Sequence, residues 1–218
     1  MPCSVRILES MTNFYNRQIL PHIMDFVCGL PVCEGARQDV VAQASGRVLE
    51  IGIGTGRNLP FYSRDKVSFL CGIDPAVHPH ARERAQVTGI DISLRALSAE
   101  HIPAEDASFD CVISTFTLCT IPDTAAALQE VRRVLVPGGK FLFLEHGVAP
   151  DASVRSWQNK LSPVWGMVAG GCCLNKDVTA LIKEAGFSFG SLDTGYKPGP
   201  RVLTYFYSGV AMVPGIAT

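Results

Sequence analysis

The sequence has no long apolar run, no Cys-x-x-Cys pair and no excess of charge of either sign. A membrane-spanning helix needs about 20 mostly apolar residues, and the longest uncharged stretch, residues 202–218, is interrupted by Ser, Thr, Gly and Pro. The formal net charge of −1 gives no general attraction to nucleic acid or to anionic lipid. We therefore expect neither a transmembrane protein nor a nucleic-acid-binding protein.

Cysteine is present but not in a metal-binding or redox pattern. None of the eight cysteines is spaced as a zinc ribbon or a thioredoxin-type pair requires. The first ten residues lack the basic start and apolar run of a secretory signal, so reduced thiols and a cytoplasmic location are expected. The adjacent Cys172 and Cys173 are more often small buried apolar residues than ligands. A soft-metal site would need several cysteines to converge, so no metal is predicted.

The 218 residues predict a single domain with three segments. Residues 1–45 are expected to form a helical lid, because apolar residues recur at steps of three and four through residues 4–30. Pro21 predicts that two helices meet near Leu20, and a further helix is expected over residues 34–44. The lid has few basic residues for a membrane-surface helix, so contact with a membrane is not favoured.

Residues 46–150 change to short apolar runs that alternate with helical segments, which is typical of a parallel sheet covered on both faces. Residues 151–218 are expected to form a substrate cap and two closing strands. The fold class is therefore α/β, a Rossmann-like doubly wound sheet that is mostly parallel with an antiparallel last strand. Expected strands cover residues 48–51, 68–73, 92–97, 111–115, 140–144, 187–193 and 202–212, and expected helices cover residues 58–63, 78–86, 124–136, 153–168 and 178–185.

The strongest local signal is VLEIGIGTGRNL, residues 48–59, in which an apolar strand leads into Gly52-x-Gly54-x-Gly56 and then toward a helix. Glycines at this point allow a sharp turn and a close approach of the backbone to a ligand. The pattern is not the GxGxxG of a dinucleotide-binding site, because Arg57 stands at the last glycine position. Asp74 ends the second apolar run, 22 residues after Gly52, close to the spacing of about 20 of a ribose-binding acid.

These motifs resemble motif I and the following acid of the class I S-adenosylmethionine-dependent methyltransferases, type 11 branch, with Glu50 as the acid before the glycines. Two further segments are similar to the same family: Ser98-Ala99-Glu100-His101-Ile102-Pro103 with the following Ser108-Phe109-Asp110, and Glu130 to Gly139. The resemblance implies S-adenosylmethionine as the cofactor. The residues expected to bind it are Glu50, Gly52, Gly54, Gly56, Asn58, Asp74, Pro75, Ser98, Ala99, Glu100, Thr115 and Phe116.

The last third resembles the animal methyltransferase-like proteins that methylate alkyl thiols. The matching segments are residues 144–147, Trp157-Gln158, Pro163-x-Trp165 and residues 171–175. This resemblance implies a small thiol as the methyl acceptor. The candidate acceptor-site residues are Tyr15 of the expected lid and Trp157, Trp165 and Cys172 of these segments, although the two Trp residues lie at helical spacing and are equally compatible with a core role.

Glu145 and His146 are the candidate catalytic residues, because they end the fifth expected strand, at the edge where ligands bind in open α/β sheets. Bracing of the loop is an equal alternative for both. Two other functions stay open. One is carbon or oxygen methylation of a quinone-like or lipid acceptor, and the other is a non-catalytic module that binds the cofactor and acts through partners.

Overall fold

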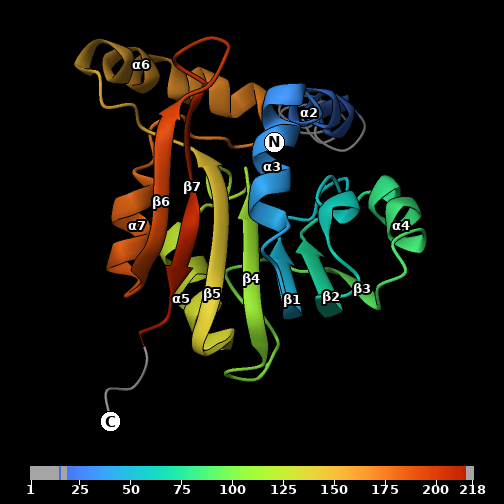
Figure 1. Cartoon of the computed structure of the whole chain (residues 1–218). Coiled ribbons are helices and arrows are strands. Elements are labelled where there is room, and N and C mark those ends of the chain that lie inside the picture. The colour runs from blue at the N-terminus through green and yellow to red at the C-terminus, as the bar shows by residue number, and fades with distance from the viewer. Residues whose placement is uncertain (1–14, 16–18, 215–218) are drawn as a thin grey trace, which may run out of the picture.

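The computed structural model describes Tyr15 and residues 19–214, which form a sheet in the order β3-β2-β1-β4-β5-β7-β6 (Figure 1). The strands are β1 (Gly46–Ile51), β2 (Val67–Asp74), β3 (Ile92–Ala96), β4 (Phe109–Thr115), β5 (Leu135–His146), β6 (Ser188–Tyr196) and β7 (Tyr205–Met212). The helices are α2 (Leu20–Cys28), α3 (Pro31–Val41), α4 (Pro79–Gln86), α5 (Thr124–Val134), α6 (Ala152–Val168) and α7 (Val178–Glu184), and η2 (Leu59–Phe61) is a single 3-10 turn.

The strand directions confirm the predicted fold class. Strands β1 to β5 pair in parallel, β7 runs antiparallel to β5, and β6 pairs antiparallel with β7. The strand order reverses between β1 and β4, so the carboxyl ends of these two strands border a crevice. Ligands of open α/β sheets bind at such a crevice.

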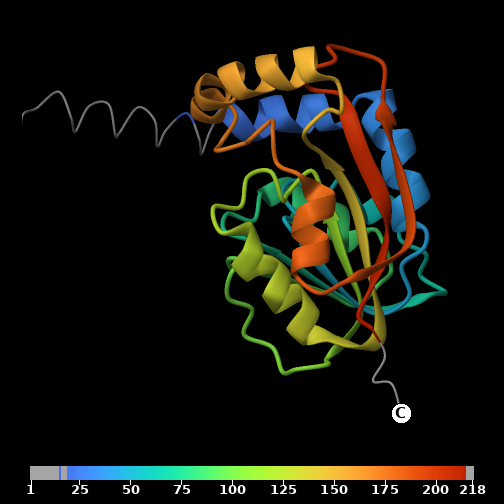
Figure 2. The ribbon, with the colours of Figure 1, turned by 90° about the vertical axis from the view of Figure 1, so that its left-hand side faces the viewer.

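Two apolar cores hold the helices against the sheet. Phe141 and Phe143 of β5 join the core under α5 and α7, whereas Leu142 and Leu144 join the core under α3 and α4. This alternation follows from the two-residue period of a strand. Figure 2 shows α5 and α7 on one side of the sheet and α3 on the other.

Helices α2 and α6 lie across the carboxyl edge of the parallel strands (Figures 1 and 2). Helix α2 begins at Leu20, as the proline at position 21 predicts, whereas the earlier expected helix lies outside the described residues apart from Tyr15 and Ile19. Within the described part of the chain, no helix is long and apolar enough to cross a membrane.

Several expected elements have other bounds in the structure, and two of these differences have a clear physical cause. The helix predicted over residues 58–63 is only the turn η2, because Tyr62 leaves helical geometry and its hydroxyl donates a hydrogen bond of 2.7 Å to Glu50. Helix α3 begins at Pro31, three residues before the predicted start, because proline suits the first turn of a helix.

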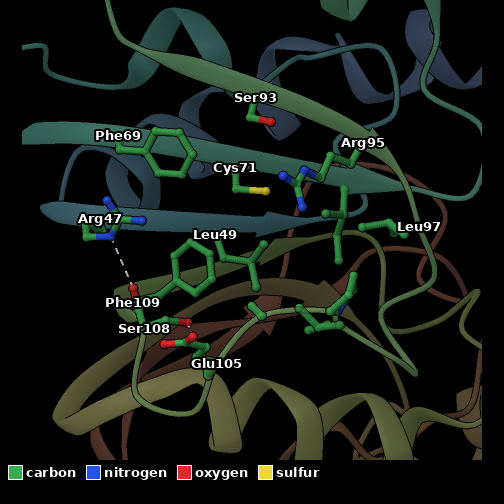
Figure 3. Close-up of a pocket in the computed structure, with 14 residues that line it drawn as sticks. Arg47, Leu49, Phe69, Cys71, Ser93, Arg95, Leu97, Glu105, Ser108 and Phe109 are labelled. Carbon is green, nitrogen blue, oxygen red and sulfur yellow. Dashed lines mark hydrogen bonds between the residues drawn. The ribbon is translucent and has the colours of Figure 1, made fainter.

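No helix follows β3, since residues 97–108 form an irregular connection across the face of β1, β2 and β3. Figure 3 shows the hollow of about 300 Å³ between this connection and the sheet. The guanidinium of Arg47 lies 4.9 Å from the centre of the Phe69 ring in it, and Arg47 Nε donates to the carbonyl of Ser108. No residue of the glycine loop lines this hollow, so it is not the predicted cofactor site.

Candidate functional site

The glycine loop lies at the carboxyl end of β1 and borders a cavity of about 290 Å³, here called the front cavity. Gly52 and Gly54 line it, and both have a positive φ, of 71° and 50°. A side chain at Gly52 would overlap the side chain of Thr117, so only glycine permits this contact. Gly56 has a φ of 79° and packs its backbone against Ala81 of α4, which is a structural role.

Asp74 ends β2 beside the glycine loop and lines the same front cavity. Its two oxygens accept hydrogen bonds from the backbone N–H of Gly54, at 3.1 Å, and of Ala76, at 2.8 Å. Burial raises the pKa of this carboxyl, while the two backbone donors oppose the rise. Asp74 is thus held in place beside the glycine loop, where a carboxylate can accept from ribose hydroxyls.

A second cavity of about 250 Å³, the side cavity, continues from the first. Pro75, Ser98 and Ala99 line it, as predicted for the adenine end of a cofactor. Glu100 does not line either cavity. Its carboxylate accepts from the Ser98 hydroxyl at 3.0 Å and from the Asp123 N–H at 2.7 Å, so it positions the loop.

The two cavities share Gly52, Asp74, Thr117 and Thr120 along their common wall. They therefore form one bent cleft over the carboxyl ends of β1, β2 and β4, which we call the cleft. Its outline matches an elongated ligand that has one end near Ser98 and Ala99, its middle at Asp74 and its other end near Thr115.

Glu50 is buried under the front cavity with a network of polar side chains. It accepts hydrogen bonds from Asn58 Nδ2 at 2.9 Å and from the Tyr62 hydroxyl at 2.7 Å. Burial raises the pKa of Glu50 to about 8, although the hydrogen bonds from Tyr62 and Asn58 work against this. The carboxyl is therefore mostly protonated at neutral pH in the absence of a ligand.

Arg37 completes this network and is a functional residue that the sequence did not reveal. It donates to Asn58 Oδ1 at 2.8 Å and to Thr115 Oγ1 at 2.7 Å, it lies 5.4 Å from the centre of the Phe116 ring, and it is only 3% exposed. Within the described residues no carboxylate forms an ion pair with it, and its Nε has no hydrogen-bond partner. A buried cation without a counter-charge is costly, so a ligand carboxylate in the front cavity would fit it.

Helix α2 forms one wall of the front cavity through Leu20, Pro21, Met24, Asp25 and Cys28. Arg57, directly after the glycine loop, binds Asp25 of this helix at 2.6 Å and Glu34 of α3 at 3.1 Å. Arg84 of α4 binds the same Asp25 at 3.0 Å. Burial opposes ionisation of Asp25, yet the bonds from Arg57 and Arg84 outweigh it and keep the pKa well below its usual range. Ion pairs thus attach the helix to the glycine loop.

Thr115 and Phe116 stand at the end of β4, on the far side of the front cavity. Phe116 has a φ of 53°, a left-handed conformation that is uncommon outside glycine and that concentrates at functional sites. Its ring packs edge-on against Phe206 at 5.1 Å between ring centres. The turn that follows brings Thr117 and Thr120 back to the cleft.

Glu145 does not line the cleft and is completely buried. Its carboxylate accepts from the Ser114 hydroxyl at 2.6 Å and from the Thr117 N–H at 3.0 and 3.1 Å, so it fixes the turn after β4. Burial raises its pKa, although the hydrogen bonds from Ser114 and Thr117 oppose that rise. The bracing alternative fits this geometry better than a proton-transfer role does.

His146, the last residue of β5, lies against two cysteines. Its Nε2 is 3.2 Å from Cys172 Sγ, and the side-chain ligand atoms of Cys119, His146 and Cys172 all lie within 4.8 Å of one another. We call these three residues the cysteine–histidine cluster. The sequence singled out His146 and Cys172, whereas Cys119 was missed because nothing in its local sequence shows which residues it meets.

The remaining predicted acceptor residues, Tyr15, Trp157 and Trp165, do not lie together in the structure. Trp165 packs against Cys119 and Cys172, and the Tyr15 hydroxyl donates to the carbonyl of Val168 at the end of α6. Trp157 is 57% exposed on α6, with Lys160 over its ring, and it lines neither cavity of the cleft. The structure therefore brings Trp165 and Cys172 together near the cleft and leaves Trp157 on the surface.

A family model described as "Methyltransferase domain" matches residues 49–143. Human "Thiol S-methyltransferase TMT1B" is 37% identical over 66% of this chain and 62% of its own length. Human "Thiol S-methyltransferase TMT1A" is 32% identical over 83% of this chain and 73% of its own. The "Ubiquinone/menaquinone biosynthesis C-methyltransferase UbiE" of Bartonella tribocorum is 33% identical over 56% of this chain and 48% of its own. The chain thus spans less than two thirds of the TMT1B relative.

Among solved structures, the Burkholderia thailandensis 1,6-didemethyltoxoflavin-N1-methyltransferase with bound S-adenosylhomocysteine aligns over 98% of this chain and 92% of its own. The TM-score is 0.67 at 14% sequence identity, a likeness that shows the fold alone. The fold, the family model and the relatives agree with the cleft that the glycine loop and Asp74 form. The chain belongs to the family of S-adenosylmethionine-dependent methyltransferases.

Proposed function

We propose that this chain transfers the methyl group of S-adenosylmethionine to a small thiol. The observation that supports the acceptor class is the extent of the sequence match to TMT1A. This human thiol S-methyltransferase matches 83% of the chain, whereas the phosphatidylethanolamine N-methyltransferase of Cereibacter sphaeroides matches 64% of it and the UbiE relative matches 56%. The family model covers only residues 49–143. A match over 83% of the chain is long enough to reach beyond residues 49–143 into the segments that cover the carboxyl edge, where an acceptor would bind.

The cleft supplies a position for each part of the cofactor. Asp74 is placed to accept from the ribose hydroxyls, Ser98 and Ala99 border the adenine end, and Arg37 offers a counter-charge to the methionine carboxylate. The cofactor supplies an activated methyl group on a sulfonium. The protein's part is to hold the acceptor in line with that group and to exclude water, which is how cofactor enzymes generally contribute.

The cysteine–histidine cluster supports an acceptor position beside the turn after β4. The Sγ of Cys119 lies 3.8 Å from the carbonyl of Phe116, and Phe116, Thr117 and Thr120 line the front cavity. An acceptor that enters beside this cluster would meet the methionine end of the cofactor. Soft, polarisable sulfur and an aromatic ring, that of Trp165, suit a thiol better than a strongly hydrated acceptor.

Thiol methylation needs little help from a base. A free thiol has a pKa of about 8.5, so about 3% is already thiolate at pH 7, and complete ionisation would increase the rate only about 30-fold. A phenol, with a pKa of about 10, begins near 0.1% ionised and needs a proper general base. With Glu145 bound to Ser114 and Thr117, His146 is the remaining candidate to assist.

The test compares small thiols, phenols and quinols as acceptors at several pH values, with the wild-type protein and with His146→Ala. In metal-free buffer we expect thiols to react best, turnover to rise with pH toward the pKa of the thiol, and His146→Ala to lower turnover by less than about 100-fold. Faster reaction of phenols or quinols than of every thiol, with a nearly inactive His146→Ala, would support a quinone-like acceptor instead. Tight cofactor binding without any methyl transfer would support a binding module.

A further inference from the structure

Three metal-ligating side chains converge beside the turn after β4, although they come from distant parts of the sequence. Cys119 lies on the turn after β4, His146 ends β5, and Cys172 lies between α6 and α7. Their ligand atoms lie within 4.8 Å of one another, and Cys119 and Cys172 are 3% and 5% exposed. The cofactor cleft uses none of these three side chains.

Backbone hydrogen bonds fix this arrangement independently of the side chains. The N–H of Cys173 donates to the carbonyl of Cys119 at 3.0 Å, and the N–H of Cys172 donates to the carbonyl of Ala169 at 3.1 Å. Gly170 and Gly171, with φ of 61° and 88°, turn the chain so that Cys172 faces inward from the end of α6. The donors are therefore prearranged by the fold, as a metal site on a rigid scaffold requires.

A buried nitrogen atom of the cluster, Nδ1 of His146, has no hydrogen-bond partner within the described residues. Buried polar atoms are rarely left unpaired in native proteins, and each such atom calls for an explanation such as a bound ion or ligand. Because Nε2 of this ring faces Cys172, the ring proton can stay on Nδ1, which leaves the Nε2 lone pair directed at the cluster, where a metal ion would accept it.

We propose that Cys119, His146 and Cys172 bind a thiophilic divalent cation, Zn²⁺ in the first instance, which leaves a fourth coordination position for the acceptor thiol. This inference rests on the proposed function for the identity of the acceptor, but not for the metal itself. Two thiolates and one imidazole are a set of protein ligands that zinc uses in catalytic sites with one open position. Thiolate and imidazole together favour zinc over magnesium or calcium, which prefer oxygen.

The metal would ionise the acceptor at neutral pH. A thiol R–SH that binds the cation loses its proton to solvent and becomes a metal-bound thiolate, since a coordinating thiol is deprotonated outright. A sulfur lone pair of this thiolate then attacks the methyl carbon of the cofactor. The new S–C bond forms as the bond between the methyl carbon and the sulfonium sulfur breaks. The electron pair of the broken bond stays on the cofactor sulfur, which becomes a neutral thioether. The product R–S–CH₃ is a neutral, weaker ligand and leaves the metal.

This step changes the pH profile of the reaction. In the metal-free protein the rate should rise with pH, because only about 3% of the thiol is ionised at pH 7. With Zn²⁺ bound the thiol is ionised already at pH 7, so the rise should flatten and the rate at pH 7 should increase by up to about 30-fold. The sequence predicted no metal, because the approach of Cys119 to Cys172 across the fold is not visible in it.

The experiment measures metal binding directly. The reduced full-length protein is freed of metal with a chelator and titrated with Co²⁺, whose bonds to thiolate give a charge-transfer absorption band, and then with Zn²⁺ in competition. Wild type should bind one equivalent and show the band. Cys119→Ser and Cys172→Ser should each lose at least about 100-fold in affinity, more than the 10–100-fold typical of an outer-sphere partner. Cys173→Ser is the matched control and should bind like wild type, because its thiol contacts only the Gly171 carbonyl.

Calorimetry with S-adenosylhomocysteine on the same samples shows that each cysteine variant is folded. Asp74→Ala should lose cofactor binding and keep the cobalt band, so a failure of the metal site is distinguishable from a failure of the cofactor site. A wild-type protein that binds the cofactor but no Co²⁺ or Zn²⁺ overturns the proposal. Binding that survives in the Cys119→Ser/Cys172→Ser double variant does so as well. If metal binds as proposed but no thiol is methylated, the site stands and the acceptor assignment falls.

Discussion

On the proposed function, Arg37 and Asp74 recognise different parts of the cofactor. Asp74 is the residue proposed for the ribose, whereas Arg37 is proposed for the carboxylate, because Asn58 and Thr115 hold it in the front cavity without a carboxylate partner among the described residues. The sequence indicated Asp74 through its spacing from Gly52. It could not indicate Arg37, because Arg37 and its hydrogen-bond partner Thr115 are 78 residues apart in the sequence. No periodic pattern in a sequence identifies contacts between residues that are so far apart.

Replacement of Arg37 by Met tests this division. We expect binding of S-adenosylhomocysteine to weaken at least about 10-fold, because a charge-assisted hydrogen bond to the carboxylate, about 1.5–3 kcal/mol, is lost. Binding of 5′-deoxy-5′-methylthioadenosine, which lacks the amino-acid end, should stay within about threefold. Asp74→Ala is the control and should weaken both ligands, by about 100-fold, because both carry the ribose. Calorimetry in which Arg37→Met weakens both ligands equally would contradict the assignment.

Glu50 links cofactor binding to protonation. Its pKa is raised to about 8 by burial, so the carboxyl is mostly neutral at pH 7 when the cleft holds no ligand. A cofactor that brings a sulfonium and an ammonium group into the front cavity favours the ionised form and lowers this pKa. Binding should therefore release up to one proton near pH 7, and affinity should rise with pH until about pH 8 and then level off.

Calorimetry of S-adenosylmethionine binding in two buffers with different heats of ionisation measures this release. Wild type should show a buffer-dependent enthalpy at pH 7, and Glu50→Gln should show none. The stability of the ligand-free protein should also depend on pH through Glu50. Because the folded pKa lies above the ordinary 4.5, the stabilising contribution of Glu50 is fully present below pH 4.5 and is lost as pH rises through about 8. Equal proton release by both proteins would exclude Glu50 as the linked group.

At the scale of elements, the sequence predicted the strands better than the segments between them. Alternating side chains such as Phe141, Leu142 and Phe143 pack on both faces of β5, so a continuous apolar run was enough to predict a buried strand. Residues 58–63 read as a helix but form one turn, because the bond from Tyr62 to Glu50 draws the chain away. Helix α2 was expected as part of a lid, and its contacts to the glycine loop depend on charges that the apolar pattern does not show.

The ion pairs between Asp25, Arg57 and Arg84 make the lid function testable. Asp25→Asn should weaken cofactor binding by about 10-fold, equivalent to about 1.4 kcal/mol, because α2 is no longer held against the front cavity. Hydrogen exchange in residues 20–28 should be faster in this variant, and in wild type it should slow when the cofactor is added. Asp193→Asn removes an exposed and longer ion pair on β6, 3.9 Å to Lys197, and should change neither quantity. If hydrogen exchange in α2 is the same with and without the cofactor, the lid function of this helix is excluded.

At the scale of the whole molecule, the parallel sheet gathers chemistry from remote segments at one edge. The glycine loop after β1, Asp74 at the end of β2, the turn after β4 and His146 at the end of β5 all meet there, beneath α2 and α6 (Figure 1). The order of the motifs along the chain was sufficient to predict that the glycine loop and Asp74 meet at this edge. The cysteine–histidine cluster was less predictable, because Cys119, His146 and Cys172 belong to three separate connections whose spatial relation only the fold defines.

The acceptor class is the central claim, and a competition assay tests it most directly. The protein is incubated with S-adenosylmethionine carrying a deuterated methyl group and an equimolar mixture of a small alkyl thiol, a phenol and a quinol, and mass spectrometry counts the label in each product. We expect at least about ten times more label in the S-methyl thioether than in the phenol and quinol products. We also expect Asp74→Ala to abolish the transfer at limiting cofactor. Label found mainly on phenol or quinol carbon or oxygen, with the thiol unlabelled, would contradict the claim.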